Sequence, residues 1–488
     1  MKLNKSFKAN IIFNAIYQIL ALLTPLITTP FISRIFDSAL IGRYSFLYSI
    51  VSYFTLFAAF GFNDFGTKYI SENRNDFNER SKIFSNIYFS KLIFSFIALF
   101  LYSFLFLFYL NDPLSIYLLI TMLLYILSIA IDPIFYFQGT EEFINICVRN
   151  IIVRVLTLVL IFIFVRSSDD LIVYSLILSV GNFVSLLIML FSLRKKIKFI
   201  KPEFKEMATI IKKSSPYFVP LLTNTLSLYG YQTLLGFFGN DSYSGLYAQA
   251  TKFTSLLIGL ISSISVIVLS RMSYLNKSKQ EDEYEKKLQQ ISRLFWLISL
   301  PCCIGLVFIN NDIVPIFFGD GYLDVIPLIY IMAACVIFSS FNTLIGNLYY
   351  RPRDKIKTHT IIVLVSTIIG IIVAIILIYC FNAIGCAIAT VFTDFLRSIL
   401  FIIYSKKEFK RETFFKEIKV PILSTLVMII SIATFKILNF YIFSLDLVYD
   451  LIITIGIGVV FYGLSLLIFK EPFTIGIINS VMRRLKKR

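Results

Sequence analysis

Long apolar runs dominate the chain, and each is about as long as a helix that crosses a lipid bilayer. Such a helix needs about 20 mostly apolar residues, and runs of this length recur along all 488 residues. Hydrophobic residues make up 58% of the chain and charged residues 15%, whereas a soluble domain is about half apolar and about a quarter charged. A soluble enzyme, a disordered chain, a disulfide scaffold and a single-span receptor are therefore excluded. Continuous runs also argue against an outer-membrane barrel, whose strands alternate polar and apolar residues.

We predict an all-α polytopic membrane protein with about fourteen transmembrane helices. The first run is too long for the apolar part of a signal peptide, and no A-x-A cleavage site follows it, so we expect an uncleaved first span. We expect segment 311–324 to form an interfacial turn or re-entrant bend, and segment 280–290 to be a solvated helix face. The predicted spans are 11–33, 44–62, 84–109, 114–136, 146–165, 171–193, 216–238, 243–269, 291–310, 325–349, 358–380, 384–404, 420–442 and 447–469.

Basic residues gather on one side of this predicted topology. When the breaks between spans are assigned alternately to the two sides, 38 of the 46 Lys and Arg residues fall on one side. The other side holds 3, namely Arg34, Arg43 and Arg166. Short basic loops stay in the cytoplasm, so we predict that both termini and segment 194–215 are cytoplasmic. This asymmetry also accounts for the net charge of +17 without a nucleic-acid partner.

A short sequence motif occurs twice. D-S-A-L-I-G-R-Y at 37–44 leads into the second predicted span, and D-S-Y-S-G-L-Y at 241–247 leads into the eighth. The two glycines, Gly42 and Gly245, are 203 residues apart, and six spans separate the copies. An even number of spans gives the two repeats the same orientation, as in transporters built from parallel six-helix halves.

The chain lacks the common motifs of enzymes and cofactor sites. It has no G-x-x-x-x-G-K-[ST] phosphate-binding loop, no C-x-x-C pair among its six cysteines, and a single histidine, His359. We therefore expect no cofactor, no metal site and no enzymatic activity, and we expect the cysteines to behave as small buried hydrophobes. Any transport would run on ion or substrate gradients.

Ionisable residues inside spans are the remaining candidates, because charge is costly at the membrane centre and usually faces a cavity or a partner. Lys252 lies near mid-depth without a carboxylate within one turn, which favours a cavity role, and Arg154 and Arg34 are favoured less strongly. Asp394 and Arg397 share a helical face and are either a structural pair or functional groups. For Lys91, Lys436, Arg43 and Asp132 we favour a position close enough to the interface to snorkel. The set is mainly cationic, so it predicts an anionic substrate such as a phosphate or pyrophosphate.

The sequence resembles the polysaccharide transporters, a family of the multidrug/oligosaccharidyl-lipid/polysaccharide exporter superfamily that flips lipid-linked oligosaccharides. The resemblance spans most of the chain, and the order and spacing of the motifs carry it. The motifs are T-P-L-I-T-T-P-F-I-S-R-I-F (24–36), I-G-R-Y-S (41–45), F-G-F-N-D-F-G-T-K-Y-I (60–70), F-Q-G-T-E-E-F (137–143), S-P-Y-F-V-P (215–220), L-G-F-F-G-N-D-S-Y-S-G-L-Y (235–247) and I-V-P-I-F-F-G (313–319).

This resemblance implies two six-helix lobes around a cavity that opens alternately to either side of the bacterial cytoplasmic membrane. The implied division is 1–193 for the first lobe, 194–215 for a cytoplasmic linker, 216–404 for the second lobe, and 405–488 for two further spans and a basic tail. Spans 13 and 14 are an addition, as in the lipid II flippase relatives, where they help to form a lipid groove. The implied substrate is undecaprenyl pyrophosphate carrying an O-antigen, capsule or exopolysaccharide repeat unit, and other polysaccharide assembly proteins are implied partners.

The resemblance also assigns site residues. The family's cavity cations on the first, second and eighth helices correspond to Arg34, Arg43 and Lys252. Together with the cations found above, the expected substrate-binding set is Lys252, Arg34, Arg43, Arg154, Arg397 and Lys91. Asp394 and Asp132 are the expected carboxylates for ion coupling.

Two other functions compete with the flippase. A drug or cation antiporter of the same superfamily would need an acidic or aromatic cavity, whereas the predicted one is basic. A membrane polysaccharide polymerase or glycosyltransferase would need large external loops with catalytic residues, and the predicted external loops are short.

Overall fold

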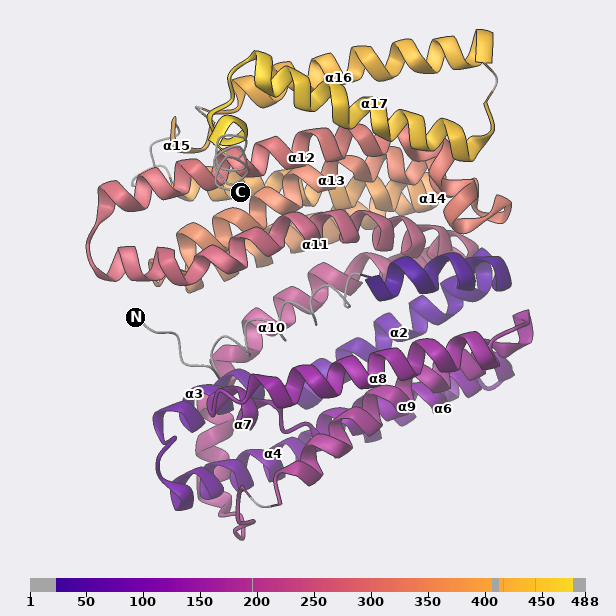
Figure 1. Cartoon of the computed structure of the whole chain (residues 1–488). Coiled ribbons are helices and arrows are strands. Elements are labelled where there is room, and N and C mark those ends of the chain that lie inside the picture. The colour runs from indigo at the N-terminus through magenta and orange to yellow at the C-terminus, as the bar shows by residue number, and fades with distance from the viewer. Residues whose placement is uncertain (1–22, 195, 406–411, 416, 444, 477–488) are drawn as a thin grey trace, which may run out of the picture. The chain divides into compact units, whose positions relative to one another are not determined.

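The computed structural model describes residues 23–194, 196–405, 412–415, 417–443 and 445–476. Within these residues the chain is helical and contains no strand. Figure 1 shows long α-helices joined by short connections. The predicted all-α fold is therefore confirmed. The first half of the predicted span 11–33 lies outside the described residues, and a helix covers 23–35.

The chain forms two compact units, Met1–Ala248 and Gln249–Arg488. The boundary falls inside a helix, and the predicted boundaries at 193, 215 and 404 stay predictions. In the first unit, α2 contacts α4, α6 and α10, and α6 and α8 both pack against α9. Its described helices after 23–35 are α2 (Ser38–Ala59), α3 (Phe62–Glu72), α4 (Phe77–Ser103), α5 (Leu105–Phe108), α6 (Pro113–Ile131), α7 (Ile134–Gly139), α8 (Phe143–Phe164), η1 (Ser168–Asp170), α9 (Leu171–Ser192), α10 (Phe204–Phe238) and the start of α11 (Asp241–Lys277).

The second unit begins within α11 and is also built from long antiparallel neighbours. α13 packs against α12 and α14, while α16 and α17 pack against each other and against α12. Its further elements are α12 (Glu281–Phe318), η2 (Asp320–Tyr322), α13 (Val325–Ile345), η3 (Gly346–Tyr350), α14 (Ile356–Ser405), α15 (Glu412–Phe415), α16 (Lys419–Leu438), η4 (Asn439–Phe443) and α17 (Leu447–Ile468).

Ten of the described helical segments are long and apolar enough to cross a membrane, so this is a multi-pass membrane protein. The predicted spans 11 and 12 are counted together, because α14 is continuous except for a kink at Asn382, whose φ is 49°. The predicted spans 7 and 8 correspond to α10 and α11, which are long but not among the ten. Polar residues such as Thr223, Thr225 and Gln232 run through α10 and lower its hydropathy.

Two sequence-based expectations are wrong. Segment 311–324 is not a loop, because α12 continues to Phe318 and ends where Gly319 adopts a φ of 87°. A positive φ at the residue after a helix is a common stop signal. The cysteines are not all buried, because the side chain of Cys380 is exposed. Segment 280–290 does fall in a helix, since α12 begins at Glu281.

The two copies of the repeated motif contact each other where α2 crosses the start of α11. The hydroxyl oxygens of Ser38 and Ser242 are 2.6 Å apart. A Cβ atom added to Gly42 would lie 1.7 Å from the carbonyl oxygen of Asp241, and one added to Gly245 would lie 1.8 Å from that of Ser38. Only glycine therefore fits at either position with the backbones this close.

This close crossing predicts that Gly42→Ala lowers the stability of the protein. The new methyl group meets backbone atoms, which cannot rotate away, and overpacking of this kind typically costs about 1–3 kcal/mol. The measurement is the thermal unfolding midpoint of the purified protein in detergent. Gly456→Ala is the matched control, because nothing lies within 4 Å of a Cβ at Gly456. Equal midpoints for the two variants would contradict the crossing.

Candidate functional site

Arg43 is held by two carboxylates at the point where the repeated motifs meet. Its Nε donates to Asp241 Oδ2 over 2.7 Å, and its guanidinium also forms an ion pair with Asp112. Ser115 Oγ accepts a further hydrogen bond of 2.9 Å. Partial burial would raise the pKa of Asp112, but hydrogen bonds from Ser115 and the charge of Arg43 outweigh it and lower that pKa. The arrangement joins α2, α11 and the start of α6, and it balances the charge of Arg43.

Lys91 lies on α4 and is fully buried, so the expectation that it snorkels to an interface is wrong. Its Nζ is 3.5 Å from Asp132 Oδ2 and donates to the backbone carbonyl of Asp132 over 2.7 Å and to Asn63 Oδ1 over 3.0 Å. Asp132 is 3% exposed, follows the last residue of α6, and accepts from the backbone N–H of Ile134 at the start of α7. Asp132 is thus buried as well.

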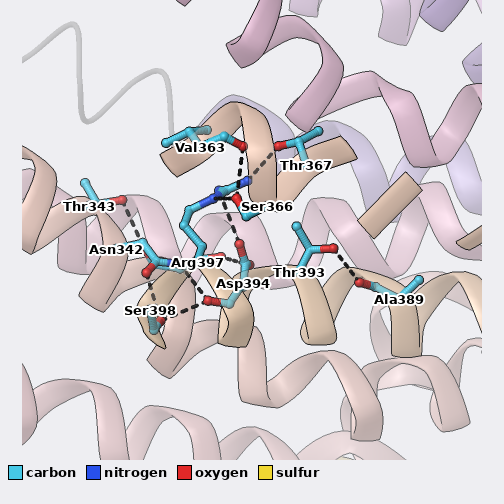
Figure 2. A network of polar contacts seen from close by, with 11 residues as sticks. Asn342, Thr343, Val363, Ser366, Thr367, Ala389, Thr393, Asp394, Arg397 and Ser398 are labelled. Carbon is cyan, nitrogen blue, oxygen red and sulfur yellow. Dashed lines mark hydrogen bonds and ion pairs between the residues drawn. The ribbon is translucent and has the colours of Figure 1, made fainter. Parts of the chain in front are cut away.

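Asp394 and Arg397 form the pair that their spacing on one helical face predicts. Their closest atoms are 3.4 Å apart. Arg397 also donates to Ser366 Oγ and Thr367 Oγ1 over 3.1 and 3.0 Å. Figure 2 shows the guanidinium lying between the two halves of α14, which this network ties together.

The same network reaches α13. Ser339 donates to the carboxylate of Asp394, and Asn342 donates to the backbone carbonyl of Asp394 over 3.0 Å. Ser398 in turn donates to Asn342 Oδ1 over 2.8 Å (Figure 2). Asp394 therefore sits in a buried polar network of hydroxyls, an amide and one cation.

A third buried ionic cluster escaped the sequence analysis. Lys436 on α16 forms ion pairs with Asp312 on α12 and with Asp450 on α17, the latter at 2.7 Å. Thr454 donates to the other oxygen of Asp450 over 3.3 Å. Asp312 and Asp450 are 5% and 7% exposed, and Lys436 lies in the last turn of α16, so its expected position near the interface stays a prediction. The only sequence signal was one charged residue at the end of each of three apolar segments.

Lys252 differs from the four cations described above. It lies in the third turn of α11, about 16 Å along the axis from the start of the helix, and its side chain is half-buried. None of the residues that the structure describes places a carboxylate within ion-pair distance of its ammonium group. Within the described residues the charge of Lys252 is therefore unbalanced, on the helix that begins with the second copy of the repeated motif.

The two other predicted cations lie apart from these clusters. Arg34 is exposed at the end of the helix over 23–35, and Arg154 is half-buried on α8. The six predicted cations therefore lie on six different helices, four in the first unit and two in the second.

An apolar cavity of about 620 Å³ lies within the second unit, between α11, α12, α16 and α17. Its walls are formed by aliphatic and aromatic side chains, by small residues and by Thr454, which also contacts Asp450. Lining residues from the four helices include Phe253, Leu257, Pro301, Met428, Gly458 and Tyr462. The cavity has the volume and polarity of a site for a small apolar ligand.

Comparisons with known proteins agree with the resemblance seen in the sequence. Residues 7–272, slightly more than half of the chain, match the family described as polysaccharide biosynthesis protein. A protein of Shigella dysenteriae that carries the provisional name O-antigen transporter is 25% identical over 79% of this chain and 96% of its own.

Solved structures share the fold. The lipid II flippase MurJ, in an inward closed conformation, aligns with a TM-score of 0.69 at 19% identity, over 96% of this chain and 99% of its own. An inward-facing multidrug resistance transporter of the MATE family aligns with a TM-score of 0.64 at 14% identity, over 82% of this chain and 97% of its own. At these identities the likeness concerns the fold alone.

The buried Lys91–Asp132 pair predicts a non-additive mutational effect. Lys91→Met leaves Asp132 as an uncompensated buried charge, and breaking such a pair typically costs about 3–5 kcal/mol. Lys91→Met combined with Asp132→Asn should be more stable than Lys91→Met alone, because no charge remains. Thermal unfolding midpoints of the two single variants and the double variant give the coupling. Purely additive losses would show that the two side chains do not interact.

Proposed function

The chain belongs to the polysaccharide biosynthesis protein family, and we propose that it is a flippase for an undecaprenyl-pyrophosphate-linked oligosaccharide. It moves an O-antigen, capsule or exopolysaccharide repeat unit across the bacterial cytoplasmic membrane by alternating access. The single observation that carries this proposal is the unbalanced cation at Lys252, because a substrate with a pyrophosphate group supplies the missing negative charge.

Charge balance at mid-depth supports Lys252 as a substrate contact. A lone ammonium group is costly in a membrane unless it is hydrated or meets an anion. Arg43, Lys91 and Arg397 each have a carboxylate partner, so they hold helices together in this proposal. Arg34 and Arg154 line the path of the substrate in this proposal.

The apolar cavity of the second unit supports a lipid-linked substrate. Among the described residues that line it, only Cys302 and Tyr462 have ionisable side chains, so it offers a polyprenyl chain an environment like that of the membrane core. Burial of apolar surface contributes about 25 cal/mol per Å², which holds the lipid end while the headgroup contacts Lys252. Two of its four walls, α16 and α17, are the added spans 13 and 14.

The proposed ion coupling rests on carboxylates inside polar networks. Protonation of Asp394 would weaken its pairing with Arg397, which joins the two halves of α14. Protonation of Asp132 would likewise weaken its pairing with Lys91. Each change alters the contacts between helices within one unit, which is what a coupling group must do.

The drug or cation antiporter stays the alternative within the same fold, since MATE structures share it. A cationic substrate would need an acidic contact, and an unbalanced Lys252 would repel it. The charge of Lys252 therefore favours an anionic substrate.

The decisive experiment replaces Lys252. Lys252→Ala should slow flipping by about tenfold or more, because a hydrogen bond to a charged group contributes about 1.5–3 kcal/mol. Lys252→Arg should retain partial activity, since the charge remains while the geometry changes. The measurement is flipping of the cells' own undecaprenyl-pyrophosphate-linked repeat unit in proteoliposomes that contain equal amounts of each variant.

Lys277→Ala is the matched control, because Lys277 is exposed at the end of the same helix. It should flip as fast as the unmodified protein. Normal flipping by a stable Lys252→Ala protein would count against the proposed contact, as would an equal loss in the Lys277→Ala variant.

The proposed topology places the start of α10 in the cytoplasm. We expect a cysteine introduced at exposed Lys205, in a chain whose six native cysteines are replaced, to react with an impermeant maleimide only after the cells are opened. Mass analysis of the labelled protein gives the result. Labelling in intact spheroplasts would place this segment outside and reverse the proposed orientation.

A further inference from the structure

Five tyrosines from four helices of the first unit converge on one another. We call them the tyrosine cluster. The members are Tyr44 and Tyr48 on α2, Tyr125 on α6, Tyr174 on α9 and Tyr229 on α10. The ring of Tyr48 lies 5.2 Å from that of Tyr125 and 5.8 Å from that of Tyr229, and the rings of Tyr44 and Tyr174 are 5.3 Å apart. Tyr44 and Tyr48 are one helical turn apart and nearly parallel, with an interplanar angle of 14°.

The cluster differs from the tyrosines that pack in the core of the same unit. Tyr102 and Tyr136 are 0% and 1% exposed, and each donates its hydroxyl to a backbone carbonyl, over 2.7 and 3.1 Å. All five members of the cluster keep part of their side chain exposed. Among the residues that the structure describes, none of these five hydroxyls donates to a backbone carbonyl. The cluster therefore has hydrogen-bonding capacity left over.

A partly exposed group of hydroxyls inside membrane-spanning helices does not suit contact with lipid. Lipid offers no hydrogen-bond partner, and burying a polar group without one costs free energy. The surfaces of α9 that suit lipid are instead aliphatic, with Leu176, Val180 and Ile188 exposed. Contact with water or a polar ligand suits this exposure better than contact with lipid.

The chemical groups of the tyrosine cluster indicate the class of ligand that it suits. The groups that act electrostatically on Tyr44, Tyr48 and Tyr125 are other tyrosines, and no carboxylate is among them in the described part of the chain. Each phenol hydroxyl can donate and accept, and each ring offers an apolar face. A sugar ring presents the matching features, namely hydroxyls around its edge and C–H groups on its faces.

We propose that the tyrosine cluster binds an uncharged sugar ring of the glycan that the substrate carries. This inference rests on the proposed function, since it assumes a glycan on the transported molecule. The cluster lies wholly within the first unit, whereas the proposed pyrophosphate contact, Lys252, belongs to the second. The cluster thereby contributes to glycan recognition without any charged residue.

The test is direct binding of an oligosaccharide to the full-length protein in detergent, measured by calorimetry. The probe is the repeat unit released from the cells' own lipid-linked pool. Tyr48→Phe combined with Tyr229→Phe keeps both rings and removes both hydroxyls, so the fold should persist while affinity falls by about two- to tenfold. Tyr102→Phe, which removes a hydroxyl from the buried core, is the matched control and should bind as the unmodified protein does.

Three results would overturn the inference. They are unchanged affinity in the double variant, no oligosaccharide binding by the unmodified protein, and saturable binding of ethidium, an aromatic cation, that the oligosaccharide does not displace. The flipping assay separates this inference from the proposed function. If the unmodified protein flips its substrate and the tyrosine variants bind normally, only the role of the cluster fails. If the unmodified protein does not flip, the proposed function fails, whatever the oligosaccharide does.

Discussion

The high cost of an unbalanced charge away from water governs how these helices pack. A charged side chain at the centre of a membrane helix costs about 2.5–3.5 kcal/mol even on the mildest scale. Lys91, Arg397 and Lys436 each meet a carboxylate within the protein. Where the partner lies on another helix, the pair also fixes which helices are neighbours. Lys436 alone links α16 to both α12 and α17.

The helical class and most spans could be predicted from the sequence, because hydropathy acts locally and over lengths fixed by the membrane. The Asp394–Arg397 pair was predictable for the same reason, since three residues on one helix share a face. The Lys91–Asp132 pair and the Lys436 cluster were not predictable. Lys91 and Asp132 are 41 residues apart, and Lys436 and its two partners lie on three separate apolar segments. Hydropathy does not predict which of these helices pack together.

Hydropathy also did not predict where the helices end. The apolar run of the ninth predicted span stops at residue 310, yet α12 continues for two more turns. Backbone hydrogen bonds extend a helix until a residue such as Gly319 turns the chain, regardless of where the membrane ends. The tyrosine cluster was missed for a different reason. Its members are ordinary aromatic residues in apolar segments, and only their shared, partly exposed position distinguishes them from core tyrosines.

The crossing of α2 and α11 gives the chain an internal version of the interface in a symmetric dimer. In such an interface the same surface of both subunits is in contact. A single substitution therefore occurs on both sides of the interface and must be compatible with itself. Here the two copies belong to one chain and can differ, but each glycine is still fitted to the backbone of the other copy. The two motif copies cannot change independently at this point. A larger residue in one copy would require the backbone of the other copy to move. The evolution of two segments about two hundred residues apart is therefore coupled.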